Sequence, residues 1–247
     1  GRIGINSADK KTIKSRQSDI FWTPIIQEAL RQNRLFLVFQ PVVELNNGTI
    51  SHYEVLLRMR SDGKIILPNV FIPVAERTGL IQAIDLWVIE NTIDFLAALP
   101  SHRAYVSVAI KLSASSLDYS DLLETIQGKL ELTWLEANRL MFEIAETAVT
   151  DNFERTLDMV NKLRGLGCKI AMKMGNTGFY FQDHLKTFPV DYIKFDGQLI
   201  KHWISDENDQ LLLKSMVDVV RKLGKKAIFV YVETPGAVLK LRDVGVT

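Results

Sequence analysis

Leu140-Met-Phe-Glu-Ile144 decides the fold, because it sets one charged side chain into a run that is otherwise apolar. A run this apolar is typical of a parallel strand that is buried on both faces. A carboxylate inside it is costly unless it reaches a partner, a ligand or water. The same pattern returns along the chain, and the other charges set near the ends of strand-like runs are Glu54, Lys111, Lys173, Lys194 and Glu233. We therefore expect one polar site at one end of a sheet.

Strand-like and helix-like patterns alternate along most of the chain. The expected strands are 35–41, 50–60, 105–112, 140–144, 169–174, 192–195 and 226–232, with helices at 19–30, 70–78, 84–99, 117–130, 153–166, 206–223 and 235–241. This alternation predicts a parallel sheet with crossover helices. At this length a TIM-like (β/α)8 barrel is favoured, and a doubly wound open sheet is the alternative. A closed barrel needs one more strand, so we expect the last strand to be missing from this chain.

The first two expected strands differ from the rest. Asn46-Asn47-Gly48 between them is typical of a tight turn, which predicts that the first two strands are antiparallel.

Composition excludes several classes of function. The 247 residues are 47% hydrophobic and 24% charged, which is typical of a soluble globular chain. The net charge of +1 provides no overall electrostatic attraction to DNA or to membranes. The single cysteine, Cys168, favours a cytoplasmic location and simple packing. No apolar stretch approaches the ~20 residues of a membrane span. The four histidines show no ligand spacing, and we expect them at the surface: His52, His102, His184 and His202.

Several motifs, in order and at the right spacing, resemble those of the EAL domain, a phosphodiesterase module that hydrolyses the bacterial messenger cyclic di-GMP. They are Phe39-Gln-Pro41, Glu54-Val-Leu-Leu-Arg58, Phe71-Ile-Pro-Val-Ala-Glu-Arg-Thr-Gly79, Glu143-Ile-Ala-Glu-Thr147 and Lys194-Phe-Asp196. The resemblance runs from about Ile25 to the end of the chain. It implies a modified barrel whose first strand is antiparallel, and it implies two divalent metals held by carboxylates and one asparagine.

The chain departs from the family pattern at the implied metal ligands. The family asparagine is replaced by Lys111, two loop aspartates by Lys173 and Met174 in the stretch 173–178, and a glutamate by Val230. Glu54, Glu143 and Lys194 remain as remnants of the catalytic set. We therefore expect a degenerate EAL domain of the Glu-Val-Leu type that is not an enzyme and holds no metal or other cofactor.

Electrostatics suggests what the new lysines do. Opposite charges a few ångströms apart attract by several kcal/mol at an effective dielectric constant of ~20. Lys111 and Lys173 are expected to pair with Glu54 and Glu143 in place of the metals. These lysines serve either to keep the barrel stable or to hold a phosphate, and the sequence leaves both roles open.

The resemblance also implies contacts to the nucleotide. The candidate residues for cyclic di-GMP are Gln40, Glu54, Leu56, Arg58, Phe71, Pro73 and Glu233. Arg58 can grip a phosphate or a guanine edge with two hydrogen bonds, or it can form an internal salt bridge at the barrel mouth. Glu233 is either a polar contact or a cap of the last helix.

Three functions remain open at this point. The first is a regulatory module that serves as a cyclic di-GMP receptor in bacterial second-messenger signalling. The second is a protein-interaction or dimerisation module that binds no nucleotide, and the third is a working phosphodiesterase. Residues 1–18 are expected to be a linker or the tail of a preceding GGDEF-like domain, and residues 19–247 the EAL domain. The expected partners are cyclic di-GMP, the neighbouring domain and a second copy of the chain.

Overall fold

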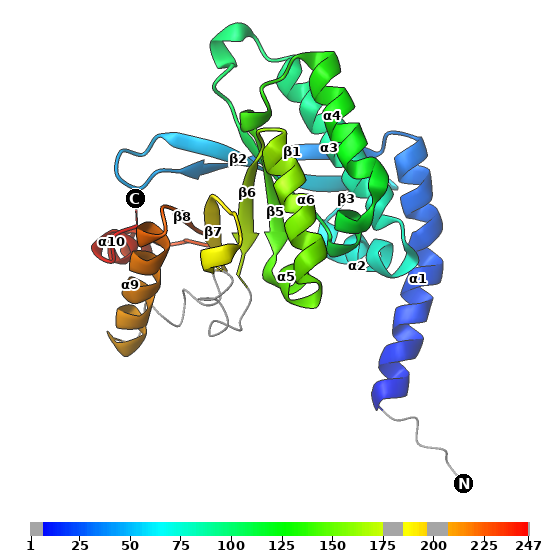
Figure 1. The fold of residues 1–247 in the computed structure, drawn as a ribbon. Helices are drawn as coiled ribbons and strands as arrows, with labels where there is room; N and C mark the ends of the chain where they lie inside the picture. Colours follow the sequence, from blue (N-terminus) through cyan, green and yellow to red (C-terminus); the bar gives the residue numbers. More distant parts are fainter. Residues whose placement is uncertain (1–6, 175–184, 197–206, 247) are drawn as a thin grey trace.

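The computed structural model describes residues 7–174, 185–196 and 207–246. A curled sheet forms the centre, and helices cover its outer face (Figure 1). Its strands are β1 (Leu35–Val43), β2 (Ile50–Ser61), β3 (Lys64–Ile66), β4 (Val108–Lys111), β5 (Leu140–Ala145), β6 (Lys169–Lys173), β7 (Tyr192–Phe195) and β8 (Lys226–Phe229). The loop 175–178 lies outside the described residues.

The described helices follow the expected alternation. The α-helices are α1 (Ser7–Arg31), α2 (Pro68–Thr78), α3 (Ile81–Ala97), α4 (Ser120–Thr133), α5 (Glu146–Asp151), α6 (Phe153–Gly165), α9 (Glu207–Lys222) and α10 (Pro235–Asp243). Three short 3-10 helices are Ser101–Arg103, Ala114–Asp118 and Ala137–Arg139. The short helix α5 and the strand β3 were not predicted, and both are minor additions to the expected pattern.

The strand order confirms the predicted barrel class. The sheet runs β1-β2-β4-β5-β6-β7-β8, with β3 attached only to β2. β1 and β2 are antiparallel, and each later pair along this path is parallel. Gly48 has φ = 70° in the predicted turn, a conformation that glycine adopts without steric cost. The sheet is a half-barrel, because β1 and β8 end the strand order on either side of an open seam.

Contacts from side chains span this seam at one end. Lys226 at the start of β8 pairs with Glu44 after β1 at 3.5 Å. Arg242 on α10 donates to the carbonyl oxygen of Leu45 at 2.5 Å. These contacts hold the two edge strands of the half-barrel in a fixed relation.

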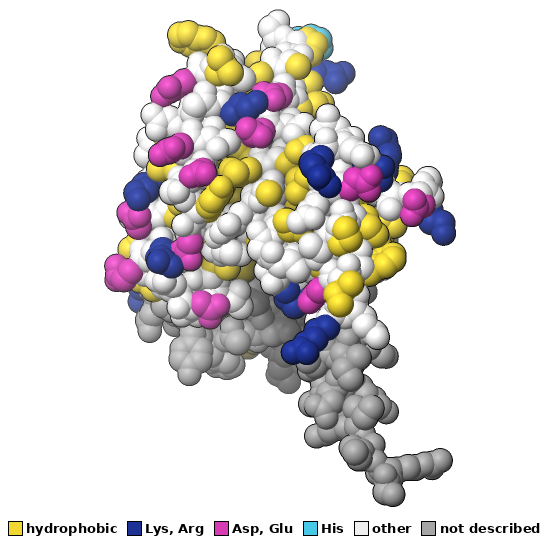
Figure 2. Space-filling model, turned by 90° about the vertical axis from the view of Figure 1, so that its right-hand side faces the viewer, with side chains coloured by type: hydrophobic (Ala, Val, Ile, Leu, Met, Phe, Trp, Pro, Cys, Tyr) yellow, Lys and Arg dark blue, Asp and Glu magenta, His cyan; other side chains and the backbone are white. Residues whose placement is uncertain are grey.

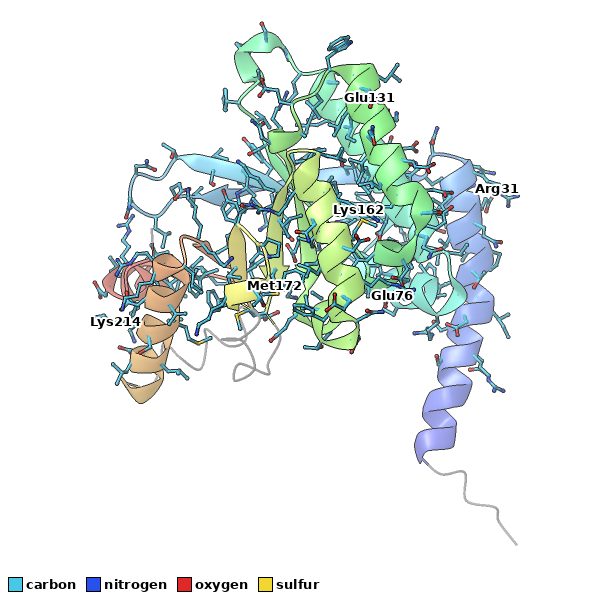
Figure 3. The ribbon with its side chains drawn as sticks, in the orientation of Figure 1. Arg31, Glu76, Glu131, Lys162, Met172 and Lys214 are labelled. Carbon is cyan, nitrogen blue, oxygen red and sulfur yellow. The ribbon has the colours of Figure 1, made fainter. Side chains whose placement is uncertain are left out.

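Alternation along each strand divides the side chains between two layers. Successive side chains point to opposite faces of a strand. Ile170 and Met172 of β6 belong to the apolar core under the helices, whereas Lys173 lines a cavity inside the curled sheet. Figure 3 labels Met172 on β6 and Lys162 on the outer helix α6. The helix-facing layer forms the core, and the inner layer is free to carry charges.

Helix α1 begins earlier than the sequence predicts. It is one helix from Ser7 to Arg31 with Pro24 inside it. Proline frees the carbonyl four residues earlier, which is that of Ile20. Ile20 is highly exposed, so water can satisfy this carbonyl. Arg77 on α2 makes two-pronged contacts with Asp19 and fixes the middle of α1.

The surface and the helices agree with the composition. The face shown in Figure 2 mixes both signs of charge with scattered hydrophobic side chains. Within the described residues, no helix is both long and apolar enough to cross a membrane.

Candidate functional site

The inner face of the half-barrel collects the charges predicted from the sequence. Parallel register places Lys111 on β4 beside Glu143 on β5, and Lys173 on β6 beside Lys194 on β7. Glu54 comes from β2, where it pairs with Gln40 of the antiparallel strand β1. Because inward-facing positions recur with period two, residues far apart in the chain meet in one layer.

Two lysines and two glutamates form a chain of alternating charges. The buried Lys194 Nζ donates to Glu54 Oε2 at 2.8 Å and to Glu143 Oε2 at 2.6 Å. Lys111 Nζ lies 2.5 Å from the other oxygen of Glu54. The two charges of each sign balance, which is what allows Glu54, Glu143 and Lys194 to be buried. We call Lys111, Glu54, Lys194 and Glu143 the charge network.

The structure corrects one expected pairing. Lys111 does pair with Glu54, but Lys173 pairs with Asp196 at 3.1 Å. Glu143 is instead paired with Lys194. The curl of the sheet is the reason, since it carries Lys194 of β7 across the interior to β5 and β2. The residue expected to be a catalytic remnant is therefore the central cation.

The network shifts the pKa values of Glu54 and Lys194. Burial alone would raise the pKa of Glu54, but the Lys194 and Lys111 ammonium groups hold it below its usual value. Burial likewise opposes the charge on Lys194, yet Glu143 and Glu54 raise its pKa above the usual lysine value. Glu54 and Lys194 are therefore both charged near neutral pH.

A cavity of about 680 Å³ opens above the charge network. Ligand cavities are usually ~300–1,000 Å³ in volume. Five of the predicted nucleotide contacts line it, namely Gln40, Glu54, Leu56, Arg58 and Glu233. Lys111, Lys173, Lys194, Glu143 and Val230 line it as well. The side chains of Lys111 and Lys173 are 52% and 41% exposed, so their ammonium groups remain accessible.

The structure bears on two questions that the sequence left open, namely the role of Arg58 and the cap of the last helix. Arg58 donates to the carbonyl oxygen of Leu57 at 2.8 Å, and no described carboxylate lies within salt-bridge distance of it. Its guanidinium therefore keeps donors available to the cavity. Thr234 caps α10 by accepting a hydrogen bond from the Ala237 amide, so the cap does not depend on Glu233.

Other predicted site residues lie outside the cavity lining. Phe71 is fully buried in the core, so its side chain cannot touch a ligand in this cavity. Pro73 is exposed on α2, away from the lining residues. Met174 is buried in the core at the end of β6, where it packs among apolar side chains. Burial in the core explains why Phe71 and Met174 are apolar.

His52 and Tyr192 were not predicted as part of the site. His52 was expected at the surface, but it is buried, lines the cavity and has a pKa lowered to about 4 by burial and by Lys194. Tyr192 also lines the cavity, with its ring 6.0 Å from that of His52. Both could have been found from the alternation of side chains along a strand, which puts every second residue on the same face. His52 precedes Glu54 by two residues, and Tyr192 precedes Lys194 by two.

The described side chains do not fit a divalent metal ion in this arrangement. Such ions prefer several oxygen ligands. Among residues 7–174, 185–196 and 207–246, no group of three or more His, Cys, Asp or Glu residues could hold one. Glu54 and Glu143 contribute carboxylates, but each already holds a lysine ammonium group. Positive charge at this site comes from the protein itself.

A half-barrel with an antiparallel first strand and charges at its inner face defines the class of protein. The family model for the EAL domain matches residues 24–247, and the chain belongs to the EAL domain family.

Similar proteins are named for their action on cyclic di-GMP. It is 31% identical over 227 residues to the cyclic di-GMP phosphodiesterase PdeB of Shewanella oneidensis, covering 91% of this chain and 26% of that protein. It is 33% identical over 213 residues to the cyclic di-GMP phosphodiesterase PdeF of Escherichia coli, covering 84% of this chain and 28% of that protein. The chain thus spans little more than a quarter of the length of these relatives.

Solved structures share the fold. The cyclic di-GMP complex of the PaMucR phosphodiesterase has a TM-score of 0.82 and 28% identity, with 90% of each chain covered. The EAL domain of FimX from Pseudomonas aeruginosa bound to cyclic di-GMP has a TM-score of 0.84 and 29% identity, with 91% of each chain covered.

These relatives overturn one expectation from the sequence. The replaced ligand positions led us to expect a chain that is not an enzyme. PdeB and PdeF are named as cyclic di-GMP phosphodiesterases, and these relatives contradict the expectation that the chain is not an enzyme. Replacement of family ligands was read from motifs alone, and motifs do not measure turnover.

Proposed function

We propose that the cavity above the charge network binds cyclic di-GMP and that the chain is a regulatory receptor module for this messenger. The observation that carries the proposal is the set of accessible cations in a ligand-sized cavity, namely Arg58, Lys111 and Lys173. Cyclic di-GMP offers two phosphodiester anions and two guanine bases. Lysine ammonium groups bind phosphate, and arginine matches both phosphate and the guanine edge.

Each cation has a distinct part in the proposed complex. Lys194 is occupied within the network, because its ammonium group donates to the carboxylates of both Glu54 and Glu143. Lys111 and Lys173 each pair with one carboxylate and still expose about half of the side chain. In the proposed complex they meet phosphate oxygens, and Arg58 meets a phosphate or a guanine base.

Calorimetric titration of the chain with cyclic di-GMP tests this proposal. Arg58→Ala removes charged hydrogen bonds worth about 1.5–3 kcal/mol, which corresponds to affinity weaker by about tenfold or more. Lys162→Ala is the matched control, because Lys162 lies on the outer helix α6 in an exposed pair with Asp158. Equal affinity of Arg58→Ala and wild type would remove Arg58 from the site. A folded chain with no affinity would favour the protein-interaction module instead.

Hydrolysis is a second candidate, favoured by the names of PdeB and PdeF. A product assay with cyclic di-GMP and added manganese tests it separately from binding. Linear dinucleotide formed faster than in a no-protein control supports hydrolysis, and a rate equal to that control rejects it.

A further inference from the structure

A second cavity lies on the opposite face of the β1–β2 pair from the charge network. Its volume is about 360 Å³, and its lining includes Phe39, Tyr53, Phe95, Leu99, Arg103 and Tyr105. Phe39 and Tyr53 come directly before Gln40 and Glu54, which line the first cavity. Since neighbouring side chains on a strand point to opposite faces, the two cavities are separated by the sheet.

Aromatic rings form the walls of this second cavity. Phe39 and Phe95 stack with ring centroids 4.4 Å apart and an angle of 22° between their planes. Phe95 is 41% exposed and Tyr105 is 80% exposed, so aromatic surface is open to solvent at this cavity. A flat ring entering the cavity would cover these aromatic surfaces by stacking.

Arg103 gives the cavity a positive charge. Its side chain is exposed, and in the part of the chain that the structure describes no carboxylate pairs with it. A guanidinium without a partner is suited to an anionic group, which it can bind with two parallel hydrogen bonds. The hydroxyl groups of Tyr53 and Tyr105 add polar contacts of the kind that orient a ligand.

The size of the cavity limits what it can take. A volume of about 360 Å³ is near the lower end of the ~300–1,000 Å³ range of ligand cavities. One ring system with one anionic group fits this range, and a cyclic dinucleotide with two bases needs more. We infer that this cavity binds a flat aromatic ring that carries a single anionic group, the chemistry of a nucleoside monophosphate or an aromatic carboxylate.

Titrations followed by amide NMR shifts test this inference, with guanosine 5′-monophosphate and indole-3-acetate as the two probes. We expect at least one of them to shift amides of residues 95–106, and the tighter probe identifies the source of the ligand. Guanosine, which lacks the charge, should bind about tenfold more weakly than its monophosphate if the nucleotide is the ligand. Inorganic phosphate alone, which lacks the ring, should not bind.

Variants separate this cavity from the first one. Arg103→Ala should weaken binding of the preferred probe by about tenfold, whereas Arg58→Ala should leave it unchanged. Arg103 is exposed, so its variant should keep the wild-type melting temperature, which serves as the folding control. The inference is overturned if neither probe binds, if the shifts are confined to residues lining the first cavity, or if Arg103→Ala binds as wild type does. These outcomes do not depend on the affinity for cyclic di-GMP.

Discussion

Lys194 on β7 donates to Glu143 on β5 and, across the interior, to Glu54 on β2. β7 and β2 are not neighbours in the sheet. A single buried ammonium group therefore ties together strands that no backbone ladder joins. The charge network is a structural brace of the half-barrel as well as the floor of the proposed binding cavity.

Removing this brace should destabilise the fold. Lys194→Met keeps much of the apolar stem but leaves Glu143 buried without a partner, a change that costs about 3–5 kcal/mol in comparable buried pairs. Urea unfolding measures the effect. Lys162→Met breaks an exposed pair on α6 and should cost about 0–1 kcal/mol. Equal losses in the two variants would contradict the role of Lys194.

The stability from this network should depend on pH in a defined direction. Glu54 has a folded-state pKa below its ordinary value of 4.5, so its contribution is present above that pH and is lost as pH falls through the folded-state pKa. Lys194 has a folded-state pKa above 10.5, so its contribution is present below that pH and is lost as pH rises through the folded-state pKa.

The acid side of this dependence is open to measurement. The stability difference between wild type and Lys194→Met should shrink as pH falls from about 7 to about 3, because protonated carboxylates no longer need the ammonium group. The difference between wild type and Lys162→Met should stay small throughout. A Lys194→Met difference that stays constant over this range would count against the assigned pKa directions.

A buried carboxylate behind the site should also matter for stability. Asp85 on α3 accepts a hydrogen bond from the Ser113 amide at 2.9 Å, two residues after Lys111, and burial raises its pKa. Asp85→Ala leaves that amide without its acceptor and should cost about 1–3 kcal/mol. Asp85→Asn keeps an acceptor oxygen and should cost less. Urea unfolding distinguishes the two, and an Asp85→Ala variant as stable as wild type would refute the role.

The sequence predicts most of this fold because its strands carry strong local signals. The run around Glu143 and the turn at 46–48 indicated a parallel strand and an antiparallel first pair, and both are confirmed. Partner choice among the charges was harder to predict. Whether Lys173 or Lys194 reaches Glu143 depends on how far the sheet curls, which is a property of the whole barrel. The prediction for His52 was wrong because it rested on the absence of metal-ligand spacing among the histidines. The place of His52 on the inner face of β2, two residues before Glu54, is what puts it in the cavity.

Binding of cyclic di-GMP should not require divalent ions. Lys111, Lys173 and Arg58 supply positive charge at the cavity, so treatment with EDTA should leave the dissociation constant unchanged. Calorimetry with and without the chelator makes the comparison. A tenfold loss of affinity on chelation would show that a metal bridges ligand and protein.

A crystal structure of the chain with cyclic di-GMP tests the central claim most directly. We expect the dinucleotide in the cavity above the charge network, with its phosphates near Lys111 or Lys173 and with Arg58 on a phosphate or a guanine edge. Lys194 should still bridge Glu54 and Glu143. A complex in which the dinucleotide lies elsewhere, or in which Lys194 has released both glutamates, would contradict this account.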